Sequence, residues 1–148
     1  MKKLLKLLPL LVAIFGAVAL WSCSDDDDKT IKSDELPAAA QQFLATYYPG
    51  VKIASATKDG SSYDVTLANG HSVDFNLQGE WTDVEAPLGE TIPSGFYPFA
   101  IDSYISSLPL TTGINEISKT FGGGYEVETV AGLELLFNAQ GDYLGIDN

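Results

Sequence analysis

The side chains that could carry chemistry are few in kind: one cysteine, Cys23, one histidine, His71, and twenty acids. A Ser–His–Asp triad would need His71 as its base. Because His71 directly follows a turn signal at Gly70, a solvated or half-packed turn residue is the plainer interpretation. A zinc site needs three or four His, Cys or acidic ligands, and one histidine with one cysteine does not provide such a set. We therefore predict no metal site and no catalytic residue.

Two other chemical signals are equally weak. The stretch FGGGY, residues 121–125, lacks the lysine and the following helix of a phosphate-binding loop, so we interpret it as a flexible hairpin tip. A glycosidase-like pair of catalytic carboxylates is not excluded, because acidic residues are plentiful, but the sequence does not mark out any one pair. A carboxylate-based hydrolase is therefore the least favoured hypothesis, and the sequence predicts a protein that is not an enzyme and holds no cofactor.

The charge balance excludes one class of partner. The net charge is −12, with eight basic residues against twenty acids. Such a surface repels phosphate backbones, and no basic stripe is present to receive them. We expect no nucleic-acid binding.

Residues 1–22 have the pattern of an export signal. The charged start MKKLLK is followed by an uncharged apolar run of fifteen residues, 7–21. A membrane-spanning helix needs about 20 such residues, whereas a charged start and a shorter apolar run are typical of a secretory signal peptide. An uncleaved short helix is the alternative.

The stretch LWSC, residues 20–23, resembles the lipobox of bacterial lipoproteins, although Trp21 is unusual at its place. The resemblance implies cleavage before Cys23 and acyl chains on its sulfur and its new amino group. Two or more chains make a stable anchor, whereas one holds only marginally. Acylation also explains a lone cysteine in an exported chain, which has no partner for an internal disulfide. The predicted partner at this end is therefore a membrane, reached through the lipid at Cys23.

The acidic stretch SDDDDK, residues 24–29, comes directly after Cys23. Calcium loops alternate their ligands with spacers and include a glycine turn, and an engineered protease site is not expected between a lipobox and its domain. We interpret residues 23–35 as a solvated, self-repelling tether. Acids after the lipidated cysteine also resemble the surface-export signal of some Gram-negative lipoproteins, which implies a surface-exposed outer-membrane lipoprotein.

The rest of the chain contains an internal repeat. The segment YDVTLANGHSVDFNLQGEWTDVE, 63–85, aligns without a gap on YEVETVAGLELLFNAQGDYLGID, 125–147, with seven identities over 23 positions. Helical spacing precedes each copy, at Leu36, Ala40, Phe43, Leu44 and Tyr47, and at Ile101, Tyr104, Ile105 and Leu108. Alternating runs and tight-turn signals follow each helix. We predict an α+β domain over 36–148, built as a tandem repeat of helix plus four-stranded antiparallel meander (36–85 and 92–148), with both helices on one face of the sheet.

A helix and a meander with Tyr-x-Val, Gly, Val-x-Phe and a glycine turn resemble the PepSY-like domain, and more specifically the β-lactamase-inhibitor-like lipoproteins. The resemblance covers about residues 36–148. It implies a broad sheet with helices on one face and, as in the inhibitor relatives, an open face that binds another protein. It carries no catalytic residues.

Strand alternation indicates which residues the open face presents. If Tyr63, Val65, Leu67, Val73, Phe75 and Leu77 lie under the helices, the intervening polar residues point the other way. The candidate binding residues are therefore Asp64, Asp74, Glu126, Glu128 and Glu134, with Leu136 as an apolar neighbour, and Phe121 at the glycine-rich tip, because exposed aromatics anchor interfaces. An acidic face that serves only solubility, and a Phe121 that covers a helix end, are the alternatives.

These observations leave three hypotheses in order. The first is a non-catalytic, surface-anchored module that binds an exported protein or peptide, and possible inhibition of that partner follows from the family resemblance. The second is an envelope accessory protein whose acidic face binds a small ligand or a cation such as calcium. The third is the hydrolase.

Overall fold

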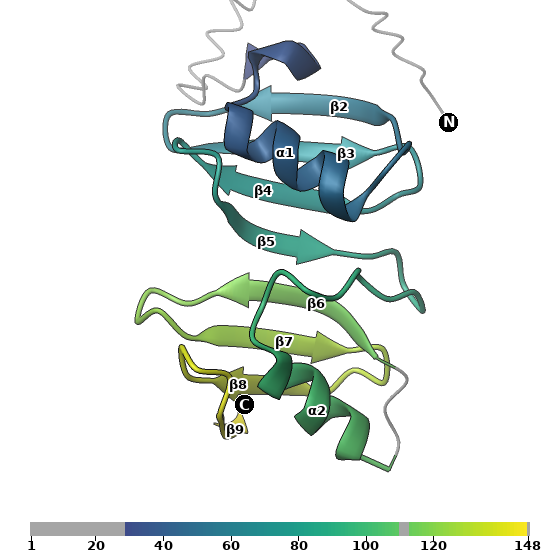
Figure 1. The fold of residues 1–148 in the computed structure, drawn as a ribbon, viewed down its shortest axis with the longest axis vertical. Helices are drawn as coiled ribbons and strands as arrows, with labels where there is room; N and C mark the ends of the chain where they lie inside the picture. The colour runs from purple at the N-terminus through teal and green to yellow at the C-terminus, as the bar shows by residue number, and fades with distance from the viewer. Residues whose placement is uncertain (1–28, 110–112, 148) are drawn as a thin grey trace, which may run out of the picture.

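The computed structural model describes residues 29–109 and 113–147. Its strands form one antiparallel sheet in which each strand pairs with the next along the chain (Figure 1). The nine strands are β1 (Lys29–Thr30), β2 (Ile53–Lys58), β3 (Ser62–Leu67), β4 (Ser72–Asn76), β5 (Trp81–Glu85), β6 (Ile114–Lys119), β7 (Tyr125–Thr129), β8 (Glu134–Phe137) and β9 (Tyr143–Ile146).

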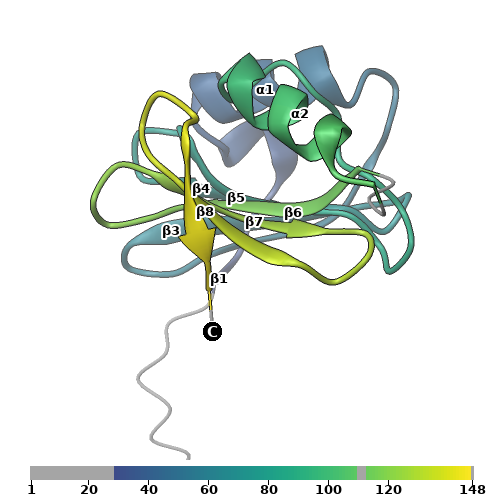
Figure 2. The same ribbon diagram turned by 90° about the horizontal axis from the view of Figure 1, so that it is seen from below.

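Two helices cover one face of this sheet and leave the other face open (Figure 2). They are α1 (Ala38–Tyr47) and α2 (Phe99–Ser107), and a single 3-10 turn, η1 (Ser33–Glu35), precedes α1. Each α-helix starts directly after a proline, whose missing N–H costs nothing at a helix start. The helices bury Ala40 and Leu44, and Ile101 and Ile105, against the sheet.

The predicted fold, an α+β tandem repeat of helix plus four-stranded meander, is wrong. Residues 29–109 and 113–147 form a single sheet of nine strands, with two α-helices and one 3-10 turn. The halves are not separate units because β5 pairs with β6, with Val84 opposite Ile117, and both of these side chains are fully buried. The strand β1 adds a further edge that the sequence pattern did not indicate.

The core follows the predicted alternation with one exception. Tyr63, Val65, Leu67, Val73 and Phe75 are buried, whereas Leu77 is 44% exposed. The reason is that β4 ends at Asn76, whose side-chain oxygen accepts the N–H groups of residues 78 and 80 and so turns the chain out of the strand. The placement of Leu77 under the helices was therefore wrong.

Close backbone contacts hold the β4–β5 turn against the start of α1. Gly79 has φ +82°, and a Cβ there would lie 2.7 Å from Pro37 Cβ and 2.9 Å from the Ala40 nitrogen. Gly141 has φ +87° and makes the same close approach to Pro98 before α2. Only glycine satisfies both the left-handed backbone and the contact. The helix starts are thereby fixed over the ends of the sheet.

Several predictions fall on residues outside the described part. The signal peptide 1–22 and the acylated Cys23 lie there, as do residues 23–28 of the predicted tether. Residues 29–35 are described: Lys29 and Thr30 pair with Lys58 and Thr57, and η1 follows. Within the described ranges, no helix is both long enough and apolar enough to cross a membrane.

Candidate binding face

The open face carries carboxylates in two rows that run across the strands. Register pairs Asp64 with Asp74 and Asp74 with Asp83 in the first row. The second row runs Glu85, Glu116, Glu128 and Glu134 across four successive strands. Glu126 continues the first row beyond Ser118. We name this set the acidic face; its members are Asp64, Asp74, Asp83, Glu85, Glu116, Glu126, Glu128 and Glu134.

Burial and mutual repulsion raise the pKa values in the middle of the acidic face. Desolvation, followed by the charges of Glu116 and Asp74, raises the pKa of Asp83 to about 7. Desolvation, with Asp64 the largest charge contribution, raises the pKa of Asp74 to about 6. The pKa of Glu116 is raised as well, mainly by burial, although its hydrogen bond with Asp83 opposes the shift. The acidic face therefore changes its charge near neutral pH.

No nearby lysine neutralises these carboxylates. The ammonium groups of Lys58 and Lys119 lie over the rings of Tyr63 and Trp81, at 5.3 and 4.5 Å, and both rings belong to side chains on the helix side of the sheet. Within residues 29–109 and 113–147, no lysine forms a salt bridge with a carboxylate. Like charges on adjacent strands are destabilising, so the acidic face repels itself and attracts cations.

The acidic face is hollowed over its second half. A recess of about 180 Å³ is lined by Glu116, Ser118, Glu126, Glu128 and Glu134. Leu136, the predicted apolar neighbour, lies opposite Glu126 and is partly buried. Across the described ranges, no three His, Cys, Asp or Glu side chains are arranged so that they could hold a metal ion. The charged side chains that line the recess are all glutamates.

The structure brings most of the sequence-predicted residues together. Asp64 and Asp74 are neighbours on β3 and β4, and Glu126, Glu128 and Glu134 share the recess. Phe121 is apart from them, at the tip of the β6–β7 hairpin, and its side chain is fully exposed. Because it is so exposed, it does not cover a helix end.

Sequence reasoning missed Asp83, Glu85 and Glu116. Alternation extended from the buried Val84 and Ile117 would have placed all three on the open face. Their proximity needs the pairing of β5 with β6, however, and that pairing is a tertiary contact with no local sequence signal.

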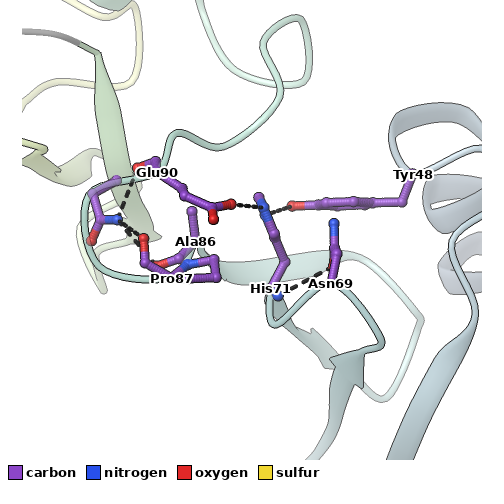
Figure 3. A network of polar contacts seen from close by, with 7 residues as sticks. Tyr48, Asn69, His71, Ala86, Pro87 and Glu90 are labelled. Carbon is purple, nitrogen blue, oxygen red and sulfur yellow. Dashed lines mark hydrogen bonds and ion pairs between the residues drawn. The ribbon is translucent and has the colours of Figure 1, made fainter.

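His71 belongs to a different network, drawn in Figure 3. It is buried rather than solvated or half-packed at its turn, which corrects the expectation from the sequence. Its Nδ1 lies 3.3 Å from the Tyr48 hydroxyl and its Nε2 lies 3.7 Å from a carboxylate oxygen of Glu90 (Figure 3). Burial lowers the pKa of His71, and the Glu90 charge opposes this only in part. The network connects the end of α1 with the β3–β4 turn and the loop after β5, so its role is structural.

Comparison with known proteins identifies similar chains. The family described as "Putative beta-lactamase-inhibitor-like, PepSY-like" matches residues 61–144. A solved putative periplasmic protein of the DUF2874 family from Bacteroides vulgatus is 33% identical; the match covers 84% of this chain and 99% of that one, with a TM-score of 0.74.

Two further solved structures are similar over most of the chain. One is described as a putative calcium-regulated periplasmic protein from Bacteroides thetaiotaomicron, with 30% identity, coverage of 82% and 98%, and a TM-score of 0.74. The other is a putative periplasmic protein of unknown function from Bacteroides vulgatus, with 30% identity, coverage of 82% and 99%, and a TM-score of 0.71. None of the curated proteins matches the chain.

Proposed function

Because the chain belongs to the PepSY-like, β-lactamase-inhibitor-like family, we propose that it is a non-catalytic module whose acidic face binds a cationic exported protein or peptide. The observation that carries this proposal is the two-row array of carboxylates on a sheet face without helices, where register places like charges side by side. The array is costly to the fold, which is the expected signature of a surface kept for binding.

The partner's chemistry follows from the face. Lysine or arginine side chains would lie over the strands and contact the rows of carboxylates, and the recess at Glu116 and Glu128 has room for one such side chain. Complementary charge of this kind speeds encounter and sets specificity. Phe121, fully exposed at the tip of the hairpin whose strands carry Glu116 and Glu126, supplies a separate apolar anchor. The family description names an inhibitor-like protein, and this description is the sole basis for including inhibition of the partner in the proposal.

The solved relatives are described as periplasmic proteins, and the proposal places this chain in the same envelope. We further propose that acyl chains on Cys23 anchor it to the outer membrane, with the acidic face turned toward exported partners. Palmitate labelling that is lost on Cys23→Ser would support the anchor, whereas labelling that persists would disprove it.

The binding proposal is tested by site-specific photo-crosslinking in intact cells. A photoreactive residue at Glu134, on the acidic face, is compared with one at Ser106, on the outer side of α2. Exported proteins joined only to position 134 are identified, purified and titrated against the purified protein at two salt concentrations. Binding should weaken as salt rises, because the attraction is between exposed charges.

Matched variants separate the face from net charge. Glu128→Lys with Glu134→Lys reverses two charges on the acidic face, and Asp34→Lys with Glu80→Lys makes the same net change elsewhere. We expect the first pair to weaken binding at least about tenfold, which corresponds to about 1.4 kcal/mol, and the second pair to have little effect. Equal loss in both pairs, or no partner joined to position 134, would refute the proposal.

The alternative is a face that binds a divalent cation, and the relative described as calcium-regulated favours it. It makes a different prediction: added calcium should raise Tm by mass action, and Glu116→Gln with Glu128→Gln should remove the rise. A Tm that does not respond to calcium leaves the protein partner as the sole candidate of the two.

A further inference from the structure

The strands β2 and β6 occupy equivalent positions in the two halves of the sheet. They differ in whether other residues cover the start of the strand on the side that faces the preceding strand. Each is the first strand after an α-helix, and each has one extra residue in its pairing, between Ile53 and Ser55 and between Ile114 and Glu116. The residue before each strand accepts one further hydrogen bond, at Lys52 O and Gly113 O. Ile53 and Ala54 therefore correspond to Ile114 and Asn115.

At β6 the loop after β5 covers the start of the strand, on the side that faces β5. The N–H of Ile92 donates to Ile114 O and the N–H of Ala86 donates to Asn115 O, both at 2.9 Å. The Asn115 side chain donates to three carbonyls of this loop, those of Ala86, Pro87 and Glu90. Ala86 and Ile92 are buried as a result. The occupant of this edge is thus a segment that turns between Pro87 and Glu90, where the Glu90 N–H donates to Pro87 O, and that buries Ile92 in the core.

At β2 the described residues supply no such cover. The N–H groups of the segment before α1 are used elsewhere: that of Ile31 donates to Ala56 O, that of Lys32 to a Glu35 carboxylate oxygen, and that of Leu36 to Ser33 O. No N–H of residues 29–37 donates to Ile53 O or Ala54 O. Ala54, which replaces the Asn115 amide, is exposed.

The uncovered edge opens into two connected hollows. A groove of about 620 Å³ follows the edge from Ile31 to Ala56. A cavity of about 280 Å³, lined in part by Leu44, Tyr48 and Val51, adjoins it, and Ser33, Val51 and Ile53 line both. The Ile53 and Ala54 carbonyls, which receive no N–H of residues 29–37, lie beside a cavity that Leu44, Tyr48 and Val51 line together with Asp34 and Gln41. A backbone edge beside such a cavity is an arrangement that binds an added backbone segment.

We propose that the β2 edge at Ile53 and Ala54 binds a segment of a partner protein that turns as residues 86–92 do at β6. The segment donates N–H groups to Ile53 O and Ala54 O and buries one apolar side chain in the cavity beside Leu44, in the way that Ile92 is buried at β6. Within the described residues, the strand before α1 is not the occupant, because Lys29 and Thr30 pair with Lys58 and Thr57, at the other end of β2 from Ile53. This site lies on a sheet edge, so it does not depend on the acidic face.

The probe is a synthetic peptide with the sequence of residues 84–93, VEAPLGETIP, the segment that covers the corresponding edge of β6. Added to the isotope-labelled purified protein, it should shift NMR signals of Ile53, Ala54, Leu44 and Val51 in a saturable way. Two backbone hydrogen bonds and one apolar side chain are expected to give a Kd between about 10 µM and 1 mM.

Three controls make the result decisive. Ala54→Arg fills the groove with an exposed side chain and should weaken binding at least about tenfold, whereas Ser106→Arg on α2 should leave it unchanged. The peptide with Ile92→Asp should not bind, because its carboxylate would enter the apolar cavity. Absence of shifts at 1 mM peptide, taken as roughly the weakest expected Kd, or equal binding to the Ala54→Arg variant, overturns the proposal. A dimer of the free protein that Ala54→Arg abolishes would also overturn it, because a second copy would then be the occupant.

Discussion

Asp74 lies directly opposite Asp83 on the open face of the sheet, with β4 and β5 in register at these two residues. Both are partly buried, and burial, the charge of Glu116 and then the charge of Asp74 raise the pKa of Asp83. Two carboxylates held together in this way keep protons that free carboxylates lose. The acidic face is consequently the part of the molecule most sensitive to pH and salt, and this leads to the first prediction.

Asp83→Asn should stabilise the protein at pH 8 and have little effect at about pH 4. Unfolded Asp83 releases its proton near its ordinary pKa of about 3.9, whereas folded Asp83 keeps it up to about pH 7. The folded state therefore binds more protons in this window, and the free energy of unfolding contributed by Asp83 falls as pH rises through it. Denaturant unfolding should show a gain of about 1 kcal/mol at pH 8, after solvent screening is allowed for. Equal effects at both pH values would contradict the raised pKa.

His71→Leu should remove a pH dependence of the opposite sign. Burial lowers the pKa of His71 in the folded state, so below about pH 6.5 the unfolded histidine takes up a proton first and the free energy of unfolding falls as the pH falls. The variant should lose about 1 kcal/mol at pH 8, because the Tyr48 hydroxyl loses its partner, but its stability should not decline further between about pH 6.5 and 5. Unfolding curves at about pH 8, 6.5 and 5 check this. If the free energy of unfolding of the variant falls with pH as steeply as that of the wild type, another group is responsible for the pH dependence.

Gly79→Ala should be destabilising by about 2 kcal/mol. The new Cβ would meet Pro37 and the Ala40 nitrogen below 3.0 Å, in a backbone with φ +82°, so strain adds to a collision with the start of α1. Gly89→Ala is the matched control, because Gly89 has φ +85° with nothing within 4 Å of its added Cβ. The control should cost only about 1 kcal/mol. Similar Tm losses in both variants would show that the contact with Pro37 is not tight.

Asn115→Ala should be destabilising by about 2–3 kcal/mol. Its buried side chain bonds to three loop carbonyls, and removal leaves them without that donor. The reverse change, Ala54→Asn at the corresponding place in β2, meets no such loop and should leave stability within about 0.5 kcal/mol. Hydrogen exchange should show faster exchange at Ile92 in the first variant alone. Slow exchange at Ile92 in the Asn115→Ala variant would mean that the backbone hydrogen bonds hold the loop on β6 without the Asn115 side chain.

Phe121→Ala should leave stability within about 0.5 kcal/mol, because the ring is fully exposed at its hairpin tip. Partner binding should nevertheless weaken by about 1–2 kcal/mol if the ring anchors the interface. Phe99→Ala is a control, since Phe99 is 79% exposed at the start of α2, on the helix side of the sheet. Equal binding by the wild type and the Phe121→Ala variant would remove Phe121 from the interface while leaving the acidic face untouched.

Local features of this protein could be predicted from its sequence. The side of a helix or strand that a residue occupies follows from its spacing to neighbours three, four or two places away. The helical spacing at Ala40 and Leu44 and the alternation at Val65 and Val73 could therefore be interpreted from the sequence. The same alternation placed Asp64, Asp74 and Glu126 on the open face. The sequence by itself therefore determined which residues face the helices, which face outward, and that the outward set is acidic.

Only the tertiary structure decided how these surfaces combine. The pairing of β5 with β6 joins residues more than thirty positions apart, Val84 and Ile117, and it makes one sheet where two units were expected. That contact brings Asp83 beside Glu116, whose charge adds to burial in raising the pKa of Asp83. The burial of His71 by Tyr48, and the cover that β6 has and β2 lacks, arise in the same way. These features share one physical reason. Each depends on a surface that a segment distant in the sequence supplies, and the local pattern of polar and apolar residues does not indicate that segment.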